Sequence, residues 1–231
     1  PLVDTIEDVC GSKGTGKWTI QQAAELGVPC ATMAAALDAR YLSSRKSERA
    51  SLAAALADAP QPAASTDPPP ADWVDALRDA IFASKLCSYA QGLSLISAAS
   101  EAHGWAIDLA ALTSAWRGGC IIRAKVLALI VDAYTKNPQL PSLLLDPAIS
   151  AELSTRAAGW RTIVAAAALR GLPSPALAAS LSYYDTFRHE TLHSAQCIQA
   201  QRDCFGGHGY RRLDVPGVFS TEWLGKSTES K

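Results

Sequence analysis

The residues best suited to chemistry lie near the start of the chain, where Lys13, Thr15 and Lys17 alternate with glycines. Gly11 to Lys17 fits the phosphate-loop pattern G-x-x-x-x-G-K, but Trp18 stands where that pattern needs a hydroxyl for magnesium. A phosphate loop also follows a strand, whereas the apolar residues at 2, 3, 6 and 9 have helical spacing. The pattern therefore disfavours a nucleoside triphosphatase. It favours a simpler anion site of lysines, a hydroxyl and exposed backbone N–H groups, with a solvated loop as the alternative.

Three further cations are candidates for binding. Arg40 lies in a stretch of Ala, Leu and Met, where it is either a phosphate ligand or an exposed charge whose stem covers apolar surface. Arg202 and His208 flank the end of the last expected helix, and the alternative for them is a cation near a helix C-terminus. We expect the pair Gly206-Gly207 to turn the chain sharply and direct His208 away from that helix.

Metal ligation is not expected. His189 and His193 have helical spacing but no evident third ligand, and His103 has no companion. The six cysteines form no C-x-x-C pair and lie in apolar patterns, so we expect reduced core residues, with a structural zinc site as the alternative.

The elements that must position these residues are predicted to be helices, in an all-α, bundle-like domain with no sheet of more than two short strands. Apolar residues recur at helical spacing, and Gly or Pro interrupts the pattern every 15 to 30 residues or so. The expected helices cover residues 19–26, 32–57 (one or two helices), 72–104, 108–117, 121–134, 147–157, 159–170, 175–189 and 194–205. Residues 58–72, rich in proline, are expected to form a mobile surface loop.

The chain is expected to divide at residue 207. We expect residues 1–207 to form an all-helical domain and residues 208–231 to form an extended C-terminal tail without a periodic core face. The tail is too apolar to remain free, so we expect it to dock on another surface.

Composition limits the function classes. The net charge of −1 argues against a general nucleic-acid binder. No apolar run approaches the ~20 residues of a membrane helix, and no secretory signal is visible. Because the chain begins at Pro1 without Met, we expect a trimmed product or a fragment.

Six strings in order resemble 6-phosphogluconate dehydrogenase. Lys13-Gly-Thr-Gly-Lys-Trp-Thr19 is similar to the family's K-G-T-G-K/R-W-T loop. The other matching strings are Asp38–Ser44, Ser84–Gly92, Trp116–Arg123, Ser182–Arg188 and Gln199–His208. The resemblance runs from about residue 2 to residue 223 and covers the family's C-terminal helical domain and tail. It implies that residues 1–207 serve substrate binding and dimerisation.

This resemblance implies roles for five residues. Lys13, Thr15 and Arg40 would bind the phosphate of 6-phosphogluconate, while Arg202 and His208 would enter the substrate site of a partner subunit in a homodimer that exchanges tails. The family usually has G-A-H-T-Y where this chain has Gly206-Gly-His-Gly-Tyr210, so the contact after the histidine is changed. The implied reaction is the NADP-dependent oxidative decarboxylation of 6-phosphogluconate to ribulose 5-phosphate, in the pentose phosphate pathway of the cytoplasm or plastid stroma.

The catalytic residues themselves are not expected in this chain. Neither the Gly-rich dinucleotide turn nor the family's catalytic K-x-x-H-N-x-x-E-Y helix occurs in the sequence, so NADP would be bound mainly by another domain. Lys85 only echoes the catalytic lysine, because the acidic partner is replaced, and Trp116–Arg123 is assigned to close helix packing. The alternative function is an inactive structural or interaction subunit that reuses the helical domain.

Overall fold

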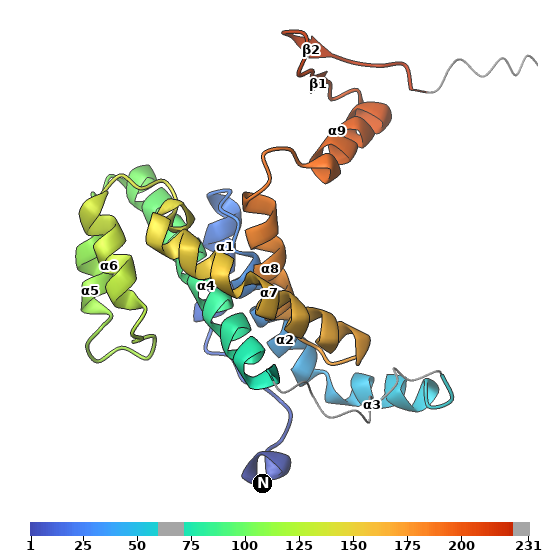
Figure 1. The fold of residues 1–231 in the computed structure, drawn as a ribbon. Helices are drawn as coiled ribbons and strands as arrows, with labels where there is room; N and C mark the ends of the chain where they lie inside the picture. Colours follow the sequence, from blue (N-terminus) through green and yellow to red (C-terminus); the bar gives the residue numbers. More distant parts are fainter. Residues whose placement is uncertain (60–71, 224–231) are drawn as a thin grey trace, which may run out of the picture. The chain divides into compact units, whose positions relative to one another are not determined.

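The computed structural model describes residues 1–59 and 72–223, and in these residues it is almost entirely helical (Figure 1). The chain divides into two compact units, residues 1–184 and 185–231, with the division near the end of α8. The expected loop 58–72 lies largely outside the described residues, and so does the end of the expected tail. The described part contains a single sheet of two short strands, as predicted.

The core of the first unit lies between two long helices, α4 (Trp73–His103) and α7 (Pro147–Leu169), which pack along each other (Figure 1). Their small and branched side chains surround Trp160, which is fully buried and donates its indole N–H to the carbonyl of Leu177 at 3.3 Å. Helix α8 (Pro175–Phe187) supplies Leu177, Leu181 and Tyr183 to the same cluster. Burial of this apolar surface holds the helices that carry the site.

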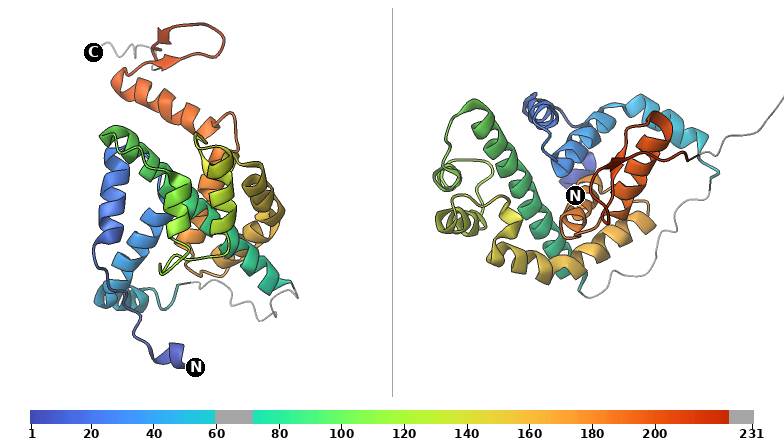
Figure 2. Two further views of the ribbon diagram at one scale, coloured as in Figure 1. Left: turned by 90° about the vertical axis from the view of Figure 1, so that its left-hand side faces the viewer. Right: turned by 90° about the horizontal axis from the view of Figure 1, so that it is seen from above.

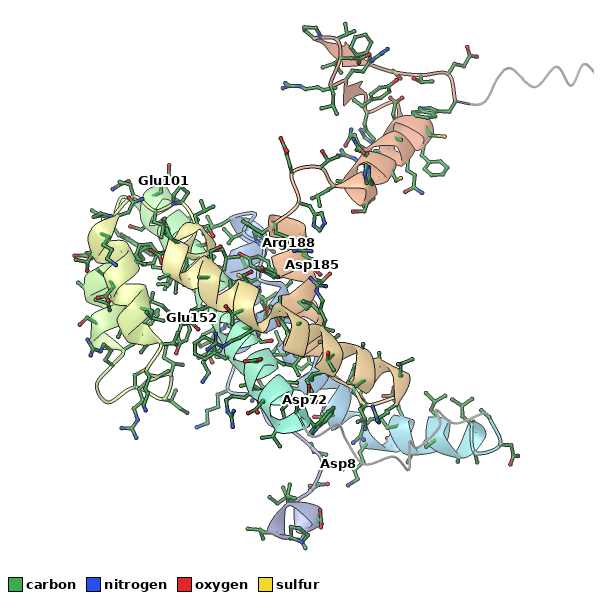
Figure 3. The ribbon with its side chains drawn as sticks, in the orientation of Figure 1. Asp8, Asp72, Glu101, Glu152, Asp185 and Arg188 are labelled. Atoms are coloured by element: carbon green, nitrogen blue, oxygen red, sulfur yellow. The ribbon has the colours of Figure 1, made fainter. Side chains whose placement is uncertain are left out.

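Helix α7 runs without interruption through Gly159, so the two helices predicted over 147–157 and 159–170 are one. Gly159 lies at the contact with α4, where an added Cβ would come within 3.1 Å of the Cα of Ala76 and 3.0 Å of Oδ2 of Asp79. The glycine therefore permits a close helix crossing instead of ending a helix. Nearby, Arg156 lies over the ring of Phe82 and pairs with Glu152 of α7. Glu152 is labelled in Figure 3.

Several predicted helix boundaries are confirmed. Gly104 ends α4 in the left-handed conformation, with φ 66°. Asp108 caps α5 (Leu109–Ala115) by accepting from the N–H of Ala111 at 3.0 Å. Asp72 precedes α4 as expected, but its side chain makes no capping hydrogen bond.

The helix predicted over 121–134 begins later, as α6 (Leu127–Lys136). Residues 120–126 form turns and irregular backbone instead: Gly119 takes a φ of 73°, and Ile121 is almost fully exposed, so it supplies no buried helix face. Helices α5 and α6 lie side by side (Figure 2). A short 3-10 turn (Leu143–Leu145) leads to α7, whose N-cap Asp146 accepts from the N–H groups of Ala148 and Ile149.

The beginning of the chain departs from prediction. The helical spacing over residues 2–9 yields only one 3-10 turn (Leu2–Thr5), whose apolar side chains are exposed. Instead of apolar packing, Asp8 (labelled in Figure 3) anchors this segment through ion pairs with Lys46 and Arg49, at 2.8 and 2.9 Å. These two cations belong to α3 (Lys46–Ala55), the second of two helices in a stretch where one or two were predicted.

The second unit contains α9 (His193–Gly206) and a hairpin of β1 (Tyr210–Arg211) and β2 (Val218–Phe219). The strands are antiparallel, with Tyr210 opposite Phe219. The tail is thus folded into a hairpin where the structure describes it. All six cysteines are free, but only Cys30 and Cys87 are buried; Cys10 and Cys197 are exposed, so the prediction of core positions was wrong for them.

Candidate functional site

The loop that carries Lys13 leads directly into α1 (Thr15–Glu25), which starts four residues earlier than predicted. Gly14 is the N-cap in the left-handed conformation, with φ 95°, and no side chain caps the helix. The N–H groups of the first turn consequently remain open to an anion, and Lys13 and Thr15 stand beside them, both exposed.

Arg40 lies on α2 (Ala31–Ser44) and reaches this loop. Its guanidinium donates to the carbonyl of Gly11, and on the next turn Ser43 Oγ accepts from the N–H of Cys10 at 2.9 Å. Helix α1 also packs on α2, since a Cβ added at Gly16 would lie 3.3 Å from Leu37 Cδ1. The structure therefore brings Arg40 to the same loop as Lys13 and Thr15, which the sequence could only suggest.

The orientation of α2 depends on a residue that sequence reasoning missed. The N-cap of α2, Cys30, offers no side-chain cap. Gln91 of α4, fully buried, replaces it: its Oε1 accepts from the N–H of Thr32 at 3.0 Å, and its Nε2 donates to Thr32 Oγ1 at 2.9 Å. A glutamine inside the apolar face of a long helix was the signal that could have revealed this role.

Arg202 and His208 lie together in the second unit. They line one hollow of about 450 Å³ with Ile198, Gln201, Phe205 and Gly206. Gly207 ends α9 with φ 60°, so the predicted sharp turn is present. The imidazole, however, lies back over Gly206, where an added Cβ would come within 2.6 Å of His208 Nε2. The expectation that His208 is directed away from the helix was therefore wrong.

The hairpin after His208 is held by Asp203, which sequence reasoning also missed. Its carboxylate accepts from the N–H groups of Gly209 and Thr221, both at 2.9 Å, from Ser220 Oγ at 2.8 Å and from Trp223 Nε1 at 2.7 Å. These donors, the N–H of Thr221 foremost, lower the pKa of Asp203 to about 2. The carboxylate is therefore ionised at neutral pH.

A second, larger hollow of about 610 Å³ opens in the first unit between α2, α4, α8 and the segment before α6. Trp116, Ile121, Ile122 and Arg123 line it, together with Lys85 of α4. Nothing lies within 4 Å of a Cβ added at Gly118 or Gly119. The prediction that the Trp116–Arg123 segment serves close helix packing was therefore wrong: it borders a cavity.

Two other features bear on function. In the part of the chain that the structure describes, no three His, Cys, Asp or Glu side chains gather closely enough to hold a metal ion. Among the helices of residues 1–59 and 72–223, none combines the length and the apolar character that a membrane crossing requires.

Comparison with known proteins agrees with this architecture. The family model for the C-terminal domain of 6-phosphogluconate dehydrogenase matches residues 1–223. The chain is 49% identical over 225 residues to the chloroplastic 6-phosphogluconate dehydrogenase, decarboxylating 2, of Oryza sativa subsp. japonica, covering 96% of this chain and 44% of the relative. It is 43% identical over 227 residues to the decarboxylating enzyme of Synechococcus elongatus, covering 97% and 47%.

A solved structure, that of Plasmodium falciparum 6-phosphogluconate dehydrogenase, superimposes with a TM-score of 0.89 at 40% identity. It covers 96% of this chain and 47% of that one, and that protein was solved without ligands, with its cofactor NADP+ and with its substrate 6-phosphogluconate. The chain spans about half the length of the relatives it matches. The chain therefore belongs to the 6-phosphogluconate dehydrogenase family and matches its C-terminal domain.

Proposed function

We propose that this chain is the C-terminal part of an NADP-dependent 6-phosphogluconate dehydrogenase and that it binds the phosphate of 6-phosphogluconate. The observation that carries the proposal is the hydrogen bond from Arg40 to the carbonyl of Gly11, which joins α2 to the loop of Lys13 and Thr15. In this proposal, two cations, a hydroxyl and an uncapped helix N-terminus bind one phosphate, and these are the groups that a phosphate dianion needs.

The chemistry that we assign to this chain is binding and orientation. Lys13 supplies a positive charge, Thr15 an O–H donor, and Arg40 has further N–H donors beyond the one bound to Gly11. Fixing the phosphate end of the sugar acid would hold the carbon skeleton in one register for reaction at the other end. We assign no catalytic residue to this chain, and Lys85 lines the larger hollow instead.

NADP would accept the hydride, but the residues described do not fit a dinucleotide site. In residues 1–59 and 72–223 the only strands are those of the hairpin, and neither leads into a helix through a Gly-rich turn. We therefore propose that the cofactor is bound mainly by a domain outside this chain. The greater length of the relatives supports this division.

The test is kinetic and uses the natural full-length protein. Replacing Arg40 with Ala removes a charge-assisted hydrogen bond to the phosphate and should weaken 6-phosphogluconate binding by about 1.5–3 kcal/mol. NADP affinity should hardly change. Arg45→Ala is the matched control, because Arg45 ends the same helix but pairs with Glu48 at the surface. If Arg40→Ala lost affinity for 6-phosphogluconate and for NADP equally, Arg40 would support only the fold.

We further propose a homodimer in which Arg202 and His208 of one subunit complete the substrate site of the other. The second unit supports this through exposed apolar side chains at Phe205 and Leu213, which are 87% and 93% exposed and call for a covering surface. The partner of this surface would be a second copy of the chain.

Mixed dimers test the exchange. One subunit of the full-length protein would carry Lys13→Ala and the other His208→Ala. If the tails cross, one site collects both defects and the other collects none, so about half of the wild-type activity should return while each parent homodimer stays poorly active. Failure of mixing to restore activity would mean that each tail serves its own subunit.

The proposed compartment is the plastid stroma or the cytoplasm, and the proposed pathway is the pentose phosphate pathway. The names of the relatives support the compartments: several are chloroplastic decarboxylating 6-phosphogluconate dehydrogenases, and others carry no compartment in their names. A fluorescent fusion of the natural full-length protein, imaged beside a plastid marker, would decide between the two compartments.

A further inference from the structure

Helix α9 buries a charged side chain and exposes its large apolar ones. Across its 14 residues the one buried side chain is a carboxylate, Asp203, at 3% exposure, while the large apolar side chains Ile198 and Phe205 are exposed. A buried charge is costly unless it is fully hydrogen-bonded. This helix therefore binds the hairpin segment, residues 209–223, through the carboxylate of Asp203, while its large apolar side chains stay exposed.

The donors to Asp203 come from both ends of the hairpin segment. The N–H of Gly209 binds at the beginning, and Ser220, Thr221 and Trp223 bind at the end. The ring of Trp223 also lies 6.1 Å from that of Tyr210, centroid to centroid. One carboxylate thus holds both ends of the segment against α9.

A second side chain of α9, Gln199, contacts both Arg202 and the backbone next to His208. Gln199 donates its Nε2 to the carbonyl of Gly209 at 2.6 Å, and its Oε1 accepts from Arg202 Nη1 at 3.3 Å. Both backbone polar groups of Gly209, the residue after His208, are therefore bound by α9, through Asp203 and Gln199. On the other side of His208, the N–H of Gly207 donates to the backbone carbonyl of Asp203 at 2.8 Å.

We propose that Asp203 and Gln199 are positioning residues that hold Arg202 and His208 as a preformed anion-binding pair on the second unit. The backbone on either side of His208 is fixed to α9, and the missing Cβ of Gly206 lets the imidazole lie on the helix end beside Arg202. Arg202 is oriented by the same glutamine that holds Gly209. Ordering these side chains before binding removes an entropy cost from the binding step.

The first experiment uses the 231-residue chain and needs no substrate. In Asp203→Asn, one carboxylate oxygen becomes an NH₂ group, so either Gly209 and Ser220, which bind Oδ1, or Thr221 and Trp223, which bind Oδ2, lose their acceptor. The remaining pair binds a neutral oxygen in place of a charged one, so the anchors at both Gly209 and Trp223 should weaken. By NMR, amide exchange at Gly209 should accelerate by about tenfold or more, and the imidazole signals of His208 should shift. Asp214→Asn is the matched control, because Asp214 pairs with Arg212 in the same unit but is exposed. His208 signals that do not move in Asp203→Asn would overturn the proposal.

The second experiment rests on the proposed function and uses the full-length protein. Asp203→Asn should lower kcat/KM for 6-phosphogluconate by roughly 10²-fold, mainly through KM, because misplacing a binding group by about 1 Å has effects of that size. In a His208→Ala background the same change should cost little more, since Asp203 acts largely through His208. If the losses in kcat/KM of the two single variants multiplied in the double variant, Asp203 would have only a structural role.

Gln199→Leu keeps the proposal testable if Asp203→Asn fails to fold. It leaves the carboxylate intact, frees Arg202 and should raise KM with smaller changes in Gly209 exchange. An unchanged KM in a folded Gln199→Leu protein would refute the role of Gln199. If the wild-type full-length protein does not turn over 6-phosphogluconate, the proposed function fails, whereas the NMR result still decides whether Asp203 positions His208.

Discussion

Replacement of Gln91 by Leu should show how strongly α2 depends on its contact with α4. Gln91 is fully buried and makes two hydrogen bonds to Thr32, which is itself only 6% exposed. Leucine has nearly the same size but leaves both the N–H and the Oγ1 of Thr32 without partners. Each buried unpaired group costs about 1–3 kcal/mol, and burial of the leucine side chain offsets about 1.5–3 kcal/mol. We expect a net loss of about 2 kcal/mol.

Denaturant titration of the 231-residue chain, followed by far-UV circular dichroism, would measure this loss, and a thermal midpoint should fall by roughly 4–8 °C. Thr32→Val sharpens the experiment because it removes Oγ1. In the double variant only the N–H remains unpaired, so the combined loss should be smaller than the sum of the single losses by about 1 kcal/mol. Additive losses would refute the tertiary cap, since they would mean that Gln91 and Thr32 contribute independently.

Two further predictions concern the helix crossing and the tail. Gly159→Ala should destabilise the chain by about 1 kcal/mol, because overpacking against α4 outweighs the helix propensity that alanine gains. The control is Gly92→Ala, which has open space around it and should stabilise the chain by about 0.5–1 kcal/mol. A stabilised Gly159→Ala variant in the same denaturant titration would contradict the tight crossing. Since the folded-state pKa of Asp203 is lowered to about 2, its contribution is complete above about pH 4, near the unfolded value, and is lost as pH falls through 2. The indole N–H signal of Trp223 should follow this titration by NMR, and Asp203→Asn should abolish it; a Trp223 signal already lost at pH 4 would contradict this account.

The sequence predicted the helical class and most helix ends because these depend on local signals. Gly104 ends α4 and Asp108 begins α5 as expected. The errors arise where tertiary contacts decide the outcome. Glycine at position 159 predicts the end of a helix, yet here it permits α4 to pack closely against α7. Residues 2–9 have a helical pattern but no surface in the described chain on which to bury it.

The candidate site shows the same division. Five candidate binding residues were proposed from a resemblance of short strings: Lys13, Thr15, Arg40, Arg202 and His208. The residues that orient them, Gln91 and Asp203, were missed because their partners lie far away in the sequence: Gln91 binds Thr32, and Asp203 binds Trp223. Polar residues at core-facing positions of helices are the signal that could reveal such supports.

The bond from Arg40 to Gly11 has a thermodynamic consequence. A guanidinium carries five N–H donors, so one side chain can hold the loop and still bind an anion, which a lysine at this position could do only with much poorer geometry. At the proposed site, closure of the loop and binding of the anion would then be linked equilibria. An anion that binds better to the closed loop would shift the equilibrium toward that loop, and a change that populates an open form of residues 10–14 would weaken anion binding without touching the anion.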